Sequence, residues 1–217
     1  MRTPFDLPLF PLHTVLFPGG LLPLRIFELR YLEMIRRAHR EGTPFGVVAL
    51  LQGTEVQRPA EAPVEAGGTA YADERFAEVG TLASVTALHN PHPGLLTARC
   101  VGTQRFRWTD TQRQQNGLWL ARATLLEPDT PLPVPADLAA TANMLRNVLA
   151  AIEQQVSDAD QRPVVPPYHL DDCAWLANTW CSLLPVPQAT KQRLLETESP
   201  LLRLELVADM LERIRPA

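Results

Sequence analysis

The residues of this chain with the clearest potential for chemistry are one histidine and two cysteines. His169 and Cys173 are four residues apart, and Cys181 follows eight residues later, a spacing that could place three zinc ligands on one face of a helix. Structural zinc sites usually contain four ligands in paired short spacings, and the sequence contains no C-x-x-C pair. We therefore expect no metal site and interpret the cysteines as small buried apolar residues.

The His169 and Cys173 pair could also supply the base and the nucleophile of a hydrolase. Nothing in the sequence indicates an oxyanion hole or a third residue that would orient the histidine. His89 and His92 flank Pro91 in an expected hairpin turn, where an exposed loop histidine is the simplest interpretation. We expect no catalytic residue and no cofactor, and a hydrolase with an unrecognised site remains an alternative.

The first thirty residues predict a strand, a turn, a second strand and a helix. Prolines at positions 8, 11, 18 and 23 interrupt a dense apolar run, which excludes a continuous helix. From Glu28 to Glu41 the apolar residues then recur with helical spacing, and Gly42 is expected to end that helix. Its buried face should contain Tyr31, Met34, Ile35 and Ala38.

The next part of the chain predicts a small twisted barrel of five or six strands. The apolar run from Phe45 to Leu51 is typical of a strand that is covered on both faces. Three further extended stretches follow: Phe76 to Leu88, Leu95 to Trp108 and Leu118 to Leu126. Residues 57–70, rich in Ala, Pro, Glu and Gly without a period, predict a mobile loop.

The carboxyl-terminal part predicts helices after a proline-rich segment, Glu127 to Pro135, which we expect to be an extended polyproline-like spacer with little internal hydrogen bonding. Helices are expected over Leu138 to Val156 and Asp171 to Leu184, then after Pro187, and after the Ser199-Pro200 cap. One face of the last helix should contain Leu201, Leu204, Val207, Leu211 and Ile214.

Several ordered motifs resemble the Lon protease amino-terminal domain, which recognises substrates. They are LPLFPL, VLFPG, LPL, IFE and RY over residues 7–31, GTLA after Val79, GTQRF from Gly102, and KQRLLE with RL near the end. The resemblance implies an α+β fold, with a PUA-like β pseudo-barrel and an early helix in residues 1–128. A linker at 129–135 and a four-helix lobe at 136–217 would complete one domain of the Lon type.

The resemblance implies a binding module without catalytic activity. The only lysine is Lys191, so no G-x-x-x-x-G-K-[ST] phosphate loop exists. A Ser-Lys dyad would have to use Lys191 as its base, and this residue is expected in an ordinary helix among polar neighbours, where its amine would not be activated. The expected partners are unfolded or client polypeptides with exposed apolar segments, together with a separately encoded ATP-dependent protease or chaperone. Candidate peptide-binding residues are Phe17, Pro18, Phe27, Glu28, Arg30, Tyr31, Arg105 and Phe106.

These candidates have structural alternatives. Glu28 could be an acid at a helix start, and Arg30 could anchor a strand to a helix through charge-assisted hydrogen bonds. The same interpretation applies to Arg105, and aromatic residues such as Phe106 could simply fill the core.

Composition limits the partners and the compartment. The 20 basic and 24 acidic residues are scattered, and Arg36 with Arg37 is the only adjacent basic pair, so no basic stripe for nucleic acid is expected. RNA binding, known for barrels of the PUA type, remains the alternative function. Three cysteines at no framework spacing and prolines throughout the apolar amino terminus favour a cytoplasmic protein with no membrane partner.

Overall fold

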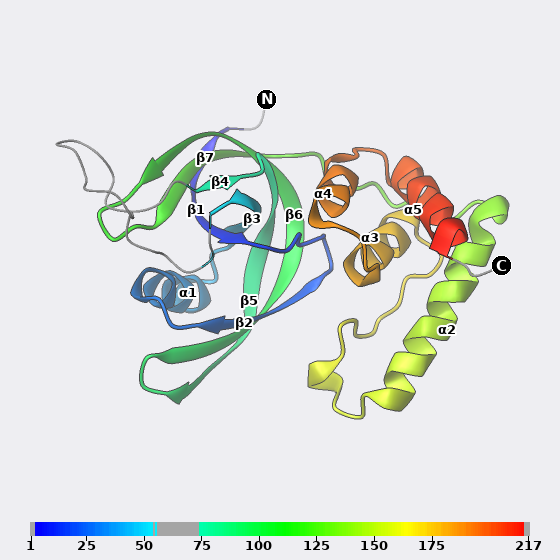
Figure 1. The fold of residues 1–217 in the computed structure, drawn as a ribbon, viewed down its shortest axis with the longest axis horizontal. Coiled ribbons are helices and arrows are strands. Elements are labelled where there is room, and N and C mark those ends of the chain that lie inside the picture. Colours follow the sequence, from blue (N-terminus) through cyan, green and yellow to red (C-terminus); the bar gives the residue numbers. More distant parts are fainter. Residues whose placement is uncertain (1–2, 54, 56–73, 215–217) are drawn as a thin grey trace.

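The computed structural model describes residues 3–53, 55 and 74–214, so the loop expected over 57–70 lies outside the described residues. A β-barrel carries one helix on its side, and four helices form a second lobe beside it (Figure 1). The barrel elements are β1 Phe5–Leu12, β2 Leu21–Ile26, α1 Leu29–Glu41, β3 Phe45–Gln52, β4 Arg75–Phe76, β5 Val79–His92, β6 Leu95–Arg113 and β7 Trp119–Leu125. The helical lobe contains η1 Ala136–Leu138, α2 Ala139–Gln155, η2 Ala159–Gln161, α3 Cys173–Leu183, α4 Gln188–Glu196 and α5 Pro200–Ile214.

The barrel closes through one parallel strand pair. The strands run in the order β1, β7, β6, β5, β3, and β3 returns to β1 by pairing with it in parallel, with Leu9 opposite Gly46. Close packing at this closure requires glycine, since a Cβ on Gly46 would lie 2.8 Å from the Leu9 side chain. The expected α+β architecture with a barrel and a four-helix lobe is therefore confirmed.

The helix α1 forms where the sequence predicts it. Glu28 is its N-cap, and Gly42 ends it with φ of 63°, a left-handed conformation that glycine adopts without strain. Tyr31, Met34 and Ile35 are buried on its inner face, where they pack against residues of β1 and β2 in one apolar cluster.

The hairpin of β5 and β6 is longer than its apolar residues indicate. The sequence predicts a hairpin turn around Pro91, but β5 and β6 remain paired until His92 lies opposite Leu95. The turn itself contains Pro93 and Gly94, and Gly94 has φ of 84°. Paired main-chain groups, rather than side-chain burial, hold this exposed end of the hairpin together.

The four predicted helices are present with ends shifted by a few residues. Pro187 is the N-cap of α4, and Pro200 occupies the first position of α5, as the sequence signals predict. The buried face of α5 differs at one position, because Ile214 is 52% exposed, and it also contains the fully buried Arg203. Within the described residues, no helix has the length and hydropathy needed to cross a membrane.

The proline-rich segment between the lobes is hydrogen-bonded to residues outside it. Leu126, just before the segment, donates to the Arg105 carbonyl. Within the segment, Val134 donates to the Asp171 carbonyl and Leu132 accepts from Cys173. Main-chain groups that leave water need partners, and both lobes supply them here. The segment is therefore attached along its length and does not behave as a free spacer.

Candidate functional site

A groove lies between the barrel and the segment that follows α2. Its volume is about 690 Å³, within the range of small-molecule and peptide pockets. We call it the inter-lobe groove; it is lined by Leu21, Pro23, Ala87, His89, Thr97, Ala98, Arg99, Asp160, Gln161, Arg162 and Pro163. In Figure 1 this region lies between β2 and the segment that continues from the lower end of α2.

The floor of the groove is the outer face of three paired strands. Pro23 of β2 lies opposite Arg99 of β6, and Arg99 in turn lies opposite Ala87 of β5. The next row of outward-facing residues contains Thr97 and His89. Because side chains on a strand alternate between faces, these residues face the groove, whereas Leu22, Leu24 and Leu96 face the barrel core.

An ion pair connects the wall of the groove to its floor. The Arg99 guanidinium contacts the Asp160 carboxylate, and its second nitrogen lies 3.4 Å from the Ala159 carbonyl oxygen. The Asp160 side chain is 84% exposed, so water and salt screen this pair and its contribution to stability is small. The wall is anchored to α2 as well, because Arg162 donates to the Val156 carbonyl at 2.9 Å.

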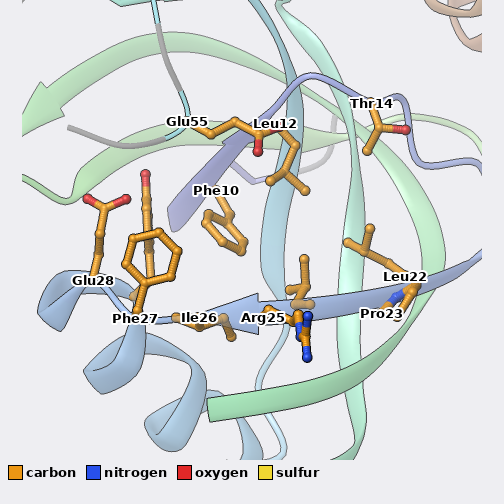
Figure 2. Close-up of a pocket in the computed structure, with 12 residues that line it drawn as sticks. Phe10, Leu12, Thr14, Leu22, Pro23, Arg25, Ile26, Phe27, Glu28 and Glu55 are labelled. Carbon is orange, nitrogen blue, oxygen red and sulfur yellow. The ribbon is translucent and has the colours of Figure 1, made fainter. Parts of the chain in front are cut away.

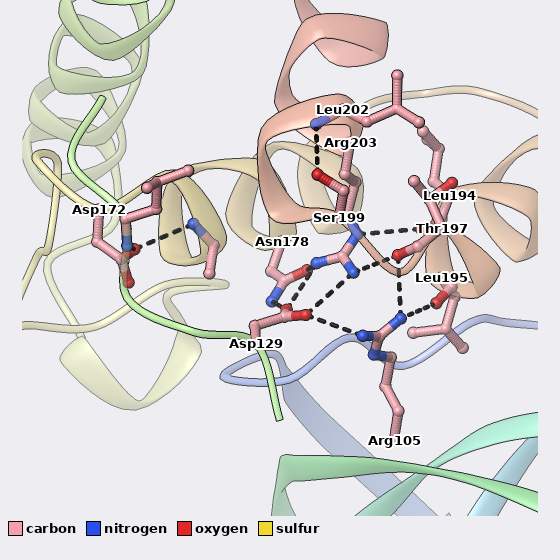
Figure 3. Close-up of polar contacts among 12 residues, drawn as sticks. Arg105, Asp129, Asp172, Asn178, Leu194, Leu195, Thr197, Ser199, Leu202 and Arg203 are labelled. Carbon is pink, nitrogen blue, oxygen red and sulfur yellow. Dashed lines mark hydrogen bonds and ion pairs between the residues drawn. The ribbon is translucent and has the colours of Figure 1, made fainter. Parts of the chain in front are cut away.

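A buried cluster of charges fixes the two lobes relative to each other (Figure 3). Asp129, in the segment between the lobes, accepts hydrogen bonds from Arg203 of α5 at 2.7 and 3.2 Å. The same carboxylate accepts a bond from Arg105 of β6 at 2.9 Å. One buried acid thus contacts one arginine from the barrel and one from the helical lobe, and its single negative charge offsets part of their positive charge.

Main-chain oxygens complete this cluster. Arg105 donates to the carbonyls of Leu195 and Thr197 at 2.9 and 3.0 Å, and Arg203 donates to Leu194 at 3.1 Å. Burial alone would raise the pKa of Asp129, but the hydrogen bonds and positive charges of the two arginines outweigh burial and lower that pKa. The carboxylate is therefore ionised at neutral pH.

A second, smaller hollow borders the unpaired edge of β2 (Figure 2). Its volume is about 270 Å³. We call it the edge pocket; it is lined by Phe10, Leu12, Thr14, Leu22, Pro23, Leu24, Arg25, Ile26, Phe27, Glu28, Tyr31 and Glu55. Phe10 and Leu12 point from β1 toward β2, so the wall nearest the barrel core is apolar.

Three of the predicted peptide-binding residues meet at the edge pocket. Phe27 is 57% exposed, and Glu28 and Tyr31 lie beside it. Arg30 is buried behind them, donating to Glu28 at 3.1 Å and to the Gly117 carbonyl at 2.8 Å. Arg30 therefore anchors α1 to the barrel, which matches the structural alternative for this residue. Burial raises the pKa of Tyr31, so its hydroxyl stays protonated.

The structure places the other predicted residues away from the edge pocket. Phe17 and Phe106 have no exposed surface and belong to the core, so neither can contact a peptide in this conformation. Pro18 is half-buried. Arg105 is 4% exposed and joins the lobes through Asp129, which matches the structural alternative for this residue.

The cysteines and the lysine considered as catalytic residues do not contact the partners that catalysis would require. The Cys173 thiol donates to the Pro133 carbonyl, and burial raises the pKa of Cys181 to about 12. Lys191 donates to the Ser182 main-chain carbonyl at 3.0 Å, whereas the Ser182 hydroxyl donates to Asn178; neither is the bond of a nucleophile to its base. Among the described residues, no three His, Cys, Asp or Glu side chains gather as a metal site would require.

The sequence contains no pattern that predicts the ion pairs of the groove and of the joint between the lobes. Arg99 and Asp160 are 61 positions apart, and both look like ordinary surface charges. Arg203 shares Asp129 across 74 positions. The proline-rich segment contains two acids, Glu127 and Asp129, and nothing in its sequence distinguishes Asp129 as the buried one.

Comparisons with known proteins match this architecture. The family model described as ATP-dependent protease La (LON) substrate-binding domain matches residues 6–213. A crystal structure of the Lon N-terminal domain protein from Xanthomonas campestris superimposes with a TM-score of 0.71 at 29% identity, covering 98% of this chain and 99% of that one. The N-terminal domain of Mycobacterium avium complex Lon protease has the same fold, with a TM-score of 0.60 at 15% identity over 97% of this chain and 100% of that one.

Curated relatives are longer proteins. Lon protease of Endomicrobium trichonymphae is 24% identical over 97% of this chain and 24% of its own length. Protein cereblon of Xenopus tropicalis is 25% identical over 79% of this chain and 33% of its own length. The chain therefore spans a quarter to a third of these curated relatives.

Proposed function

Because this chain belongs to the family of the ATP-dependent protease La (LON) substrate-binding domain, we propose that it binds exposed apolar segments of unfolded or client polypeptides without catalysing a reaction. The observation that supports this proposal is the inter-lobe groove. Its floor presents Leu21, Pro23 and Ala87, and apolar surface of this kind favours partners that remove it from water.

The chemistry of the groove suits an unfolded chain better than a small substrate. Its floor is a sheet surface, long in one direction, with polar groups at the wall where Gln161 and Arg162 lie. A disordered ligand loses conformational entropy when it is held, so we expect modest affinity. Three cysteines that are free and buried agree with action in a reducing compartment such as the cytoplasm.

A role in proteolysis is part of the proposal. We infer that a bound client is delivered to an ATP-dependent protease or a chaperone, because one of the proteins that this chain resembles is a Lon protease. The similarity to protein cereblon supports a recognition role that is not tied to one catalytic partner. A pull-down from native cells, scored for proteases and chaperones, tests this part separately.

Titration with a labelled reporter polypeptide tests client binding. The unfolded form of the reporter should bind, and its folded form should not. Ala87→Arg fills the groove from its floor and should weaken binding by about tenfold. The matched control is Ala150→Arg on the exposed face of α2, which should leave affinity unchanged.

Equal signals from the folded and unfolded reporter would refute client recognition. Equal loss in both arginine variants would mean that the groove is not where the client binds. RNA binding, the alternative function, would appear as affinity for structured RNA that falls steeply with salt.

A further inference from the structure

The strand β2 is paired on one side only. It lies antiparallel to β6, with Leu22 opposite Cys100 and Pro23 opposite Arg99, and no second strand pairs with it among the described residues. An unpaired strand edge presents main-chain donors and acceptors that can accept another chain. Here that edge borders the edge pocket.

The direction of each main-chain group follows from the register. The Gly102 amide donates to the Gly20 carbonyl at 2.9 Å, so Gly20 faces β6. In an antiparallel ladder this orientation recurs at every second residue, so Leu22 and Leu24 face β6 as well. Leu21, Pro23 and Arg25 therefore direct their main-chain groups outward, and proline is placed where its missing N–H removes nothing from the ladder.

The outward groups have no partner in the part of the chain that the structure describes. No hydrogen bond to another segment involves the main chain of Leu21, Pro23 or Arg25, and Pro23 and Arg25 are exposed. The edge thus offers carbonyl oxygens at all three positions and N–H donors at Leu21 and Arg25. A gap in the donor series at Pro23 would give a bound strand a defined register.

The edge pocket decides which side chains a bound strand can carry. In a strand added beside β2, residues next to Leu22, Leu24 and Ile26 would face the same side as those residues. That side is the apolar wall with Phe10 and Leu12 (Figure 2). The remaining residues of the added strand would face outward, on the side of Pro23 and Arg25.

We infer that the unpaired edge of β2 binds an extended polypeptide as an added β-strand, with apolar residues at alternate positions filling the edge pocket. This inference rests on the proposed function for the class of ligand, an unfolded polypeptide, and it assigns a second site beside the inter-lobe groove. Main-chain hydrogen bonds supply affinity in such complexes, and alternate side chains supply specificity.

Amide hydrogen exchange of the intact protein, followed by NMR, tests the inference. The probe is a capped peptide of alternating valine and threonine, and its matched control carries N-methyl groups on one edge. In the free protein the amides of Leu21 and Arg25 should exchange fast, while those of Leu22 and Leu24, bonded to β6, are protected. Saturating peptide should slow exchange at Leu21 and Arg25 by about tenfold or more, and the N-methylated peptide should not.

A second variant adds a donor to the edge. Pro23→Val restores an N–H at the gap without disturbing the β6 ladder, so affinity for the alternating peptide should rise about fivefold. This gain cannot result from unfolding. If Pro23→Val leaves the affinity for the alternating peptide unchanged, strand addition at the edge of β2 is contradicted.

The outcomes separate the two sites. Peptide binding with unchanged exchange at Leu21 and Arg25 would overturn strand addition and leave the groove proposal intact. No binding of this peptide or of the unfolded reporter would overturn both. Protection that rises with protein concentration without peptide would overturn the inference in favour of pairing between two copies of this chain.

Discussion

Arg203 and Asp129 form a forked ion pair, with nitrogen to oxygen distances of 2.7 and 3.2 Å, inside the joint between the barrel and the helical lobe. The Arg203 side chain is fully buried, and that of Asp129 is 8% exposed. Arg105 contacts the same carboxylate. The free energy of unfolding therefore depends on this acid more than on any exposed pair.

Removal of the shared acid should be strongly destabilising. Asp129→Ala leaves two buried guanidinium groups without their counter-charge, and we expect it to lower the free energy of unfolding by about 3 kcal/mol or more. Urea denaturation measures the change. The control is Asp6→Ala, which breaks the exposed pair with Arg122 and should change stability by less than about 1 kcal/mol. Similar losses in both variants would contradict the role of Asp129.

Asp129 should also make the free energy of unfolding decrease at low pH. Its pKa is lowered below the ordinary value of 3.8 by Arg203 and Arg105 against the opposing effect of burial. The unfolded chain therefore binds a proton more readily than the folded one, so this stabilisation is complete above the ordinary pKa and is lost as pH falls through the folded pKa. Melting temperatures measured from neutral pH down to about pH 3 should fall more steeply in the parent than in Asp129→Asn.

Loss of Arg30 should affect stability rather than recognition. Its side chain is 2% exposed and pairs with Glu28, so Arg30→Ala should cost about 3 kcal/mol in unfolding free energy. Under conditions in which the variant remains folded, affinity for the unfolded reporter should be unchanged. Phe27→Ala is the matched comparison, because Phe27 is exposed at the edge pocket. A selective loss of affinity in Arg30→Ala, with normal stability, would restore Arg30 as a contact residue.

The ion pair across the groove should influence access more than stability. Asp160→Asn removes the charge that Arg99 contacts, and stability should change by less than about 1 kcal/mol because the acid is exposed. Amides around η2 should exchange faster, and the unfolded reporter should associate faster. Asp137→Asn, on an exposed acid of η1, serves as the control. Equal exchange in both variants would show that Arg99 does not restrain this segment.

The cysteines should be unreactive in the folded protein. All three are buried, and burial raises the pKa of both Cys100 and Cys181 to about 12. Because the thiolate is the reactive form, alkylation at neutral pH should be slow and should track global unfolding measured with denaturant. Rapid labelling of Cys173 in the native state would instead revive a nucleophilic role for that residue.

Local signals in the sequence predict the elements of this fold well. Gly42, Pro187 and Pro200 each mark a helix boundary through a conformational constraint on one residue, and such constraints do not depend on distant partners. The extension of β5 to His92 could not be predicted in this way, since main-chain pairing with β6 holds it.

The candidate site was predicted only in part. Phe27, Glu28 and Tyr31 lie close together in the sequence and all line the edge pocket, and their role in peptide binding stays a prediction. The inter-lobe groove depends on contacts between residues such as Arg99 and Asp160, whose pairing is decided by the packing of the lobes. A single sequence contains no measure of that packing, and the burial of Arg203 was missed for the same reason.

One carboxylate that pairs with arginines from both lobes also limits how the protein can respond to a client. A hinge opening at this joint would strand at least one guanidinium group in a dry environment, so the lobes should move as a rigid body. The binding surface is then preorganised, and the client bears nearly all of the ordering entropy. Selection among clients would depend on how readily each segment extends, with little contribution from a closing motion of the host.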